Sequence, residues 1–119
     1  MAVTVLDPGP IAHTSLIRYD DPDIETGLDN RGHKIESASY RLVEVDLDDL
    51  EDMGWIPSEP QQFGTSMTES VKRYEDLPPV VIVRTDRGRG FGLIDGLNRV
   101  HAHWAAGRST IRAYELMLG

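Results

Sequence analysis

The chain has 119 residues, enough for one domain, and its 39% hydrophobic residues allow a modest core. A formal net charge of -8 argues against a generic nucleic-acid binder, whose affinity comes largely from Lys and Arg side chains that contact phosphates. The chain has no cysteine, which excludes disulfides, thiolate metal sites and cysteine nucleophiles.

The N-terminal segment does not look like a targeting sequence. It lacks a basic region and is interrupted by Pro8 and Pro10, unlike a signal peptide. No stretch is long and apolar enough to predict a membrane span. We therefore expect a cytoplasmic protein that makes no membrane contact.

Residues 1–38 show little hydrophobic periodicity. The stretch 20–34 is polar and rich in turn-forming residues, which predicts a long loop, and the one strand signal is a short run at 13–19. A long loop in a small domain is usually functional, disordered or docked on a partner. We divide the chain into an N-terminal arm or extension, residues 1–38, and a domain, residues 39–119.

The first half of this domain predicts a strand and a helix. Residues 40–47 alternate apolar and polar side chains, which is a strand pattern. A helical turn or bend follows, and then a loop with two prolines at 56–64. Residues 65–77 read as a short helix that Ser66 or Thr68 would cap.

The second half predicts a hairpin, a helix and a last strand. Residues 78–85 form a continuous apolar run typical of a buried strand, and 91–95 form the return strand after a glycine-rich turn. A helix begins near Gly96 and ends before Gly107, which suits the position just past a helix end. Residues 109–116 form the last strand.

The junction between the strand ending at Asp95 and the following helix predicts an anion site. The first N–H groups of a helix have no intrahelical acceptor and carry partial positive charge. Gly96 lacks a Cβ that would keep a ligand from the backbone, and Arg99 in the first turn can bind a phosphate bidentately. The alternative is that Asp95 is the N-cap and that Arg99 pairs with Asp95 or a neighbouring acid.

Other polar motifs do not predict a metal site. His101 and His103 are two residues apart, so on a helix they point to opposite faces and cannot chelate one ion. A calcium loop starting at Asp21 would have Thr26 at its sixth position and Gly32 at its twelfth, where Gly and Glu are required. We interpret these acids as solvated.

The order of the second-half motifs resembles the ParB-like nuclease and sulfiredoxin superfamily. The stretch LIDGLNRVHAHWAAGRSTIRAYEL, residues 93–116, is similar to the family's strand, Gly-x-x-Arg turn, helix and last strand. Residues 40–52 resemble its first strand, and 70–96 resemble its helix, Pro-Pro strand and hairpin. The resemblance covers about 40–118 and implies an α+β fold with a small mixed sheet and two or three helices.

The resemblance also implies a binding site. In this family the Gly-x-x-Arg turn binds nucleotide phosphates, so we expect ATP, ADP or CTP with Mg²⁺. Asp95 would cap the helix or help to hold the metal ion. The implied phosphate-binding residues are Asp95, Gly96, Leu97, Asn98 and Arg99, supported by Thr68, Lys72 and His101. Two carboxylates, Glu44 and Asp46, would flank the same cleft as catalytic residues that orient a water or a hydroxyl.

The chain departs from the best-known members of that family. Leu97 stands where sulfiredoxin-like members have their catalytic cysteine, so sulfinic acid repair by that route is excluded. No ParB-type helix-turn-helix is expected, and clamp formation on DNA is therefore not predicted.

Three functions remain open. The first is a stand-alone nucleotide-binding domain that acts as a nucleotidase or phosphotransferase. The second is a non-enzymatic adaptor or dimerisation module, in which residues 1–38 dock on a protein partner or swap within a homodimer. The third is a nuclease, which the acidic charge favours least.

Overall fold

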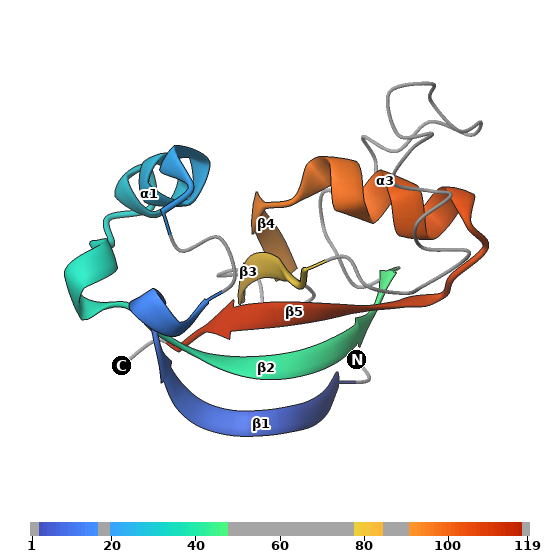
Figure 1. The fold of residues 1–119 in the computed structure, drawn as a ribbon, viewed down its shortest axis with the longest axis horizontal. Coiled ribbons are helices and arrows are strands. Elements are labelled where there is room, and N and C mark those ends of the chain that lie inside the picture. Colours follow the sequence, from blue (N-terminus) through green and yellow to red (C-terminus); the bar gives the residue numbers. More distant parts are fainter. Residues whose placement is uncertain (1–2, 17–19, 48–77, 85–90, 118–119) are drawn as a thin grey trace.

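The computed structural model describes residues 3–16, 20–47, 78–84 and 91–117 (Figure 1). Five strands and two α-helices lie in these ranges, with short 3-10 turns at His13–Ser15 and Ile35–Ser37. In chain order the elements are β1 (Val3–Ala12), α1 (Pro22–Asp29), β2 (Ser39–Asp46), β3 (Val80–Arg84), β4 (Phe91–Asp95), α3 (Leu97–Ala105) and β5 (Thr110–Leu116).

The strands form one mixed sheet in the order β1-β2-β5-β3-β4. Neighbouring strands are antiparallel except β3 and β5, which are parallel. The parallel pair follows from the connection through α3, because a parallel partner needs a crossover, usually a helix. The expected α+β fold with a small mixed sheet is confirmed. No helix in the described ranges is long and apolar enough to cross a membrane.

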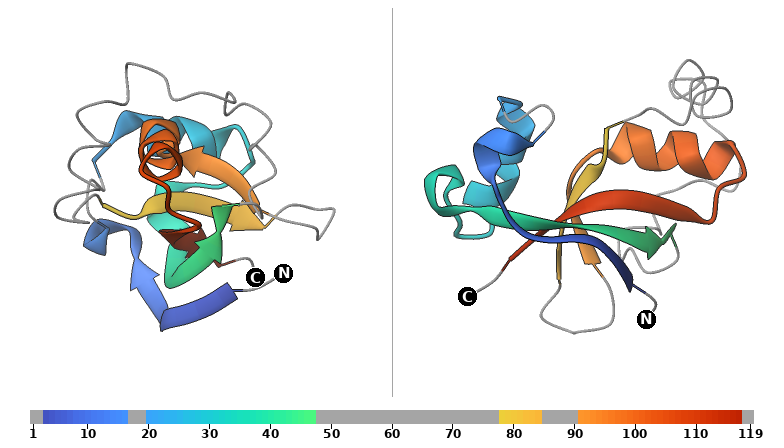
Figure 2. Two further views of the ribbon diagram at one scale, coloured as in Figure 1. Left: turned by 90° about the vertical axis from the view of Figure 1, so that its right-hand side faces the viewer. Right: turned by 60° about the horizontal axis from the view of Figure 1, so that its bottom comes forward.

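Alternation along the strands produces two apolar clusters. Strands β3 and β4 run between the helices, and the views in Figures 1 and 2 agree that β1 and β2 lie on the side away from both helices. The first cluster joins Val100 of α3 to residues of β2, β3, β4 and β5 such as Val43, Val80 and Ala113. The second joins Ile24 and Leu28 of α1 to the other face, including Tyr40, Val81, Ile94 and Tyr114.

The predictions for residues 39–119 hold where the structure describes them. Strands β2, β3, β4 and β5 lie at the expected positions. Helix α3 ends as predicted: Gly107 has a φ of 80°, its N–H donates to Trp104, and the N–H of Arg108 donates to His103. These two bonds satisfy carbonyls of the last turn. The helix expected at 65–77, the loop at 56–64 and the turn at 86–90 lie outside the described residues.

The predictions for residues 1–38 are wrong in their secondary structure. Val3–Ala12 is a strand paired with β2, His13–Ser15 is a 3-10 turn instead of a strand, and α1 lies within the predicted loop. Asp21 caps α1 by accepting from the N–H of Asp23, and Pro22 follows at the first helical position. An Asp at the N-cap followed by a Pro at the first helical position is a helix-start signal. The polar composition of the segment nevertheless favoured the prediction of a loop. The division at residue 38 stays a prediction.

Candidate functional site

The predicted anion site lies at the junction of β4 and α3. Gly96 is the N-cap of α3, with φ 114° and ψ 26°, and the first turn contains no acidic residue. The first intrahelical bond runs from the N–H of Val100 to the carbonyl of Gly96 at 2.9 Å. The backbone N–H groups of Leu97, Asn98 and Arg99 therefore have no acceptor within the helix and carry its positive dipole end.

Gly96 is required for packing as well as for its backbone conformation. A Cβ at this position would lie 2.5 Å from Cγ1 of Val80 and 2.9 Å from its Cβ. Position 96 thus packs against β3, which corrects the expectation that the missing Cβ leaves room for a ligand. The positive φ is a second reason for glycine, because side chains with a Cβ are strained there.

The side chain of Arg99 is buried and holds the junction together. Its Nη1 donates to the carbonyls of Pro78 at 3.2 Å and Pro79 at 2.8 Å, and its Nη2 donates to Oδ2 of Asp95 at 2.7 Å. Only 4% of Arg99 is exposed. The structure therefore adopts the alternative in which Arg99 pairs with Asp95. Asp95 is not the N-cap, because Gly96 takes that position.

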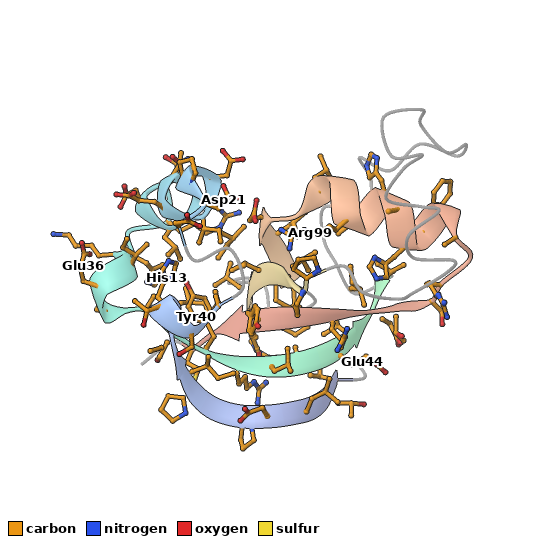
Figure 3. The ribbon with its side chains drawn as sticks, viewed as in Figure 1. His13, Asp21, Glu36, Tyr40, Glu44 and Arg99 are labelled. Atoms are coloured by element: carbon orange, nitrogen blue, oxygen red, sulfur yellow. The ribbon has the colours of Figure 1, made fainter. Side chains whose placement is uncertain are left out.

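Two acids from the other helix join this junction. Carboxylate oxygens of Asp21, Asp23 and Asp95 lie within 4.8 Å of one another, so the start of α1 and the end of β4 meet there. Figure 3 shows Asp21 on α1 and Arg99 on α3 on either side of β4. Mg²⁺ and Ca²⁺ are coordinated by carboxylate oxygens, so these three acids could bind a divalent cation. Sequence reasoning interpreted Asp21 and Asp23 as solvated acids, because only the fold brings them to Asp95.

The two histidines of α3 differ in their surroundings. His101 is buried, and burial lowers its pKa because the charged imidazolium is disfavoured away from water. His103 is half-buried, and its Nδ1 donates to the carbonyl of Arg99 at 2.8 Å. Burial is the main cause that lowers the pKa of His103, and nearby arginines add to it. Both side chains therefore favour the neutral form in the folded protein.

Acidification is expected to destabilise the fold through these two histidines. Because their pKa values are lowered on folding, the folded state binds fewer protons than the unfolded state. Their contribution is fully present above the ordinary pKa of 6.5 and is lost as the pH falls from there through the lowered folded values. Urea denaturation at a series of pH values measures this. A double variant His101→Gln, His103→Gln should flatten the profile, and an unchanged profile would refute the explanation.

The predicted catalytic carboxylates lie elsewhere. Glu44 is paired in register with Arg112 of β5 and Asp46 with Thr110. Strand alternation turns both away from the face of Val43, which packs in the cluster of α3. Figure 3 shows Glu44 beyond β5 from Arg99. The structure does not bring Glu44 and Asp46 together with Arg99, and their catalytic role stays a prediction.

The other predicted site residues are only partly described. Leu97 is the first residue of α3 and is half-buried, and Asn98 contributes its backbone to the first turn. Thr68 and Lys72 lie outside the described residues. His101 lies two residues after Arg99 on the same helix and is buried, as described above. The first turn of α3 thus offers backbone groups, and the side chain of Leu97 offers no reactive atom.

Comparison with known proteins identifies the fold. No family model matches the sequence, and no curated protein matches it significantly. Among solved structures, a sulfiredoxin from Arabidopsis thaliana matches 62% of this chain at 23% identity with a TM-score of 0.51, over 82% of its own length. The chromosome-partitioning protein ParB from Caulobacter crescentus, complexed with CTP-γ-S, matches 66% of this chain at 17% identity with a TM-score of 0.51. The match spans 45% of that ParB chain. The chain therefore has a ParB/sulfiredoxin-like fold.

Proposed function

We propose that this domain binds the phosphates of a nucleotide at the N-terminus of α3. The observation that carries the proposal is the first turn of α3, which begins at a glycine with no capping side chain and contains no acid. Its backbone N–H groups are donors suited to a phosphate. The ParB structure with the same fold, which is complexed with CTP-γ-S, supports a nucleotide as the source of that phosphate.

In this proposal the backbone binds the phosphate and Arg99 positions the turn. The guanidinium of Arg99 already donates to Pro79 and Asp95, so it does not supply the bidentate phosphate grip that the sequence alone predicts. It ties α3 to the segment before β3 and thereby fixes the direction of the first-turn N–H groups. Positioning by a buried side chain suits a site that must be rigid.

The ligand in this proposal is ATP, ADP or CTP with Mg²⁺. Leu97 supplies no nucleophile, so hydrolysis or phosphoryl transfer would depend on the metal ion, on a bound acceptor or on residues 65–77. A nucleotidase or phosphotransferase activity would therefore require groups beyond those that bind the phosphate. The cytoplasmic location stays a prediction.

Nucleotide binding is expected to weaken when a negative charge is added to the first turn of α3. Asn98→Asp should lower the affinity for ATP or CTP by about tenfold or more, because charge repulsion replaces attraction at the phosphate position. The same change favours the helix itself, since acids stabilise helix N-termini, so loss of binding is separable from loss of folding. Isothermal titration with ATP, ADP and CTP, with and without Mg²⁺, measures the affinity.

Ser109→Asp is the matched control for this variant. It adds the same charge at an exposed residue between α3 and β5, at the opposite end of the helix. It should leave the affinity unchanged. The proposal fails if folded wild-type protein binds none of the three nucleotides, or if Asn98→Asp binds them as tightly as Ser109→Asp does.

The alternative of an adaptor or dimerisation module rests on the N-terminal region. Strand β1 is at the edge of the sheet, and its Val5 and Leu6 are exposed by 43% and 47%. Exposed apolar side chains on an edge strand favour pairing with another chain. Deleting residues 1–38 would remove β1 and α1 from the core, so point changes at Leu6 are the cleaner test of self-association.

A further inference from the structure

A cavity lies at the opposite end of β3 from Arg99. It has a volume of about 320 Å³ and is lined by Arg41, Arg84, Glu115, Leu116 and Met117. Arg84 is the last residue of β3, whereas Arg99 donates to Pro78 and Pro79, which precede it. The cavity is therefore separate from the junction of β4 and α3, and the proposed nucleotide site does not use it.

A buried carboxylate and two arginines form the polar wall. The side chain of Glu115 is 5% exposed and accepts from Nε and Nη2 of Arg41 at distances between 2.7 and 3.2 Å. Nη2 of Arg84 lies 3.7 Å from Glu115, an ion-pair contact that is too long for a hydrogen bond. Two positive groups face one negative group, so the wall carries one excess positive charge.

Arg84 is held in place but keeps donors for a ligand. Its guanidinium lies over the ring of Phe91, 5.1 Å from the centroid, and its side chain is 43% exposed. Among the described residues, its contacts are this ring and the long ion pair with Glu115. A planar guanidinium with this exposure matches a carboxylate in geometry and charge.

The exposed apolar side chain of the lining is Met117. It is 42% exposed beside the arginines, whereas the side chain of Leu116 is buried in the cluster of α1 on the other face of the sheet. A volume of about 320 Å³ is at the small end of the range for ligand pockets, which suits a short ligand. One excess positive charge next to the exposed Met117 side chain suits a monoanion that carries a small aliphatic group.

We propose that this cavity binds a carboxylate attached to a short aliphatic side chain. The carboxylate would accept from Arg84, and the aliphatic group would contact Met117. A free branched-chain acid and the C-terminal carboxylate of a peptide that ends in an aliphatic residue share this chemistry. Glu115 would hold Arg41 and draw Arg84 toward the cavity.

The test is an amide and arginine Nε chemical-shift titration of the full chain at pH 7. The probes are 4-methylpentanoate, which is the free acid, and acetyl-glycyl-leucine, which is the peptide form. Both should give saturable shifts at Arg84, Glu115 and Met117, whereas neutral 4-methylpentanamide should give none. Tighter binding of one acid would identify the source that the cavity prefers.

Two variants complete the test. Arg84→Gln should weaken binding by about tenfold or more, because it removes the charged donor. Arg112→Gln, an equal charge change at an exposed residue of β5 whose side chain points to the other face, should leave it unchanged. Absence of saturable shifts with both acids, or equal affinity of Arg84→Gln and wild-type protein, would overturn the proposal. Neither outcome bears on nucleotide binding at α3.

Discussion

Replacing Arg99 with methionine is expected to lower the free energy of unfolding by about 3–5 kcal/mol, because the change removes one partner of a buried ion pair. The carboxylate of Asp95 has a side chain that is 11% exposed, and it would lose the guanidinium donor 2.7 Å away. The carbonyl of Pro79 would lose its donor as well. Urea denaturation at pH 7, which compares midpoints at equal slope, measures the change.

Two further variants separate charge from geometry at this position. Arg99→Lys keeps the charge but cannot donate to Pro79 and Asp95 in one planar fork, so it should retain only part of the stability. The double variant Asp95→Asn, Arg99→Met removes the carboxylate charge together with its guanidinium donor and should be more stable than Arg99→Met alone. If Arg99→Met unfolds at the wild-type urea concentration, Arg99 does not hold the junction.

Replacing Gly96 with alanine is expected to cost about 3 kcal/mol of stability, the sum of left-handed backbone strain and overpacking. The added Cβ would lie 2.5 Å from Cγ1 of Val80. Gly107→Ala is the matched control, because Gly107 also has a positive φ but a Cβ there would meet nothing within 4 Å. It should cost only about 1–2 kcal/mol, the strain alone.

The contribution of the contact with Val80 can be tested by shortening the Val80 side chain. In the double variant Gly96→Ala, Val80→Ala the crowding is removed, so the loss should be smaller than the sum of the two single losses. Additive losses would contradict the packing explanation, as would equal losses for Gly96→Ala and Gly107→Ala.

Much of the second half of the fold could be predicted because its signals are local. The apolar run at β3, the return strand β4 and the end of α3 at Gly107 each depend on neighbouring residues. Strand β1 could not be predicted in the same way. It is an edge strand with mostly exposed side chains, interrupted by Pro8 and Pro10, and it is defined by its pairing with β2. Edge strands carry little periodic burial pattern.

The position of the candidate site in the chain could be predicted from the sequence, but the contacts of its side chains could not. The Gly-x-x-Arg segment lies where the pattern predicts it, at the junction of β4 and α3, with Gly96 as the N-cap and Arg99 in the first turn. The partners of Arg99 at Pro78 and Pro79, and the approach of Asp21 and Asp23 to Asp95, depend on residues distant in the chain. The local sequence pattern predicts which groups can bind an anion. Only the fold shows which of these groups already have hydrogen-bond partners within the protein.

If backbone N–H groups at the start of α3 bind nucleotide phosphate, their amide chemical shifts must respond to the ligand. The measurement is the amide shift of Gly96, Leu97, Asn98 and Arg99 during titration with ATP or CTP in the presence of Mg²⁺. We predict saturable downfield shifts at these four amides, larger than those elsewhere on α3, and much smaller shifts with the corresponding nucleosides. Unchanged amide shifts at these positions in folded protein, at millimolar nucleotide, would contradict phosphate binding at α3.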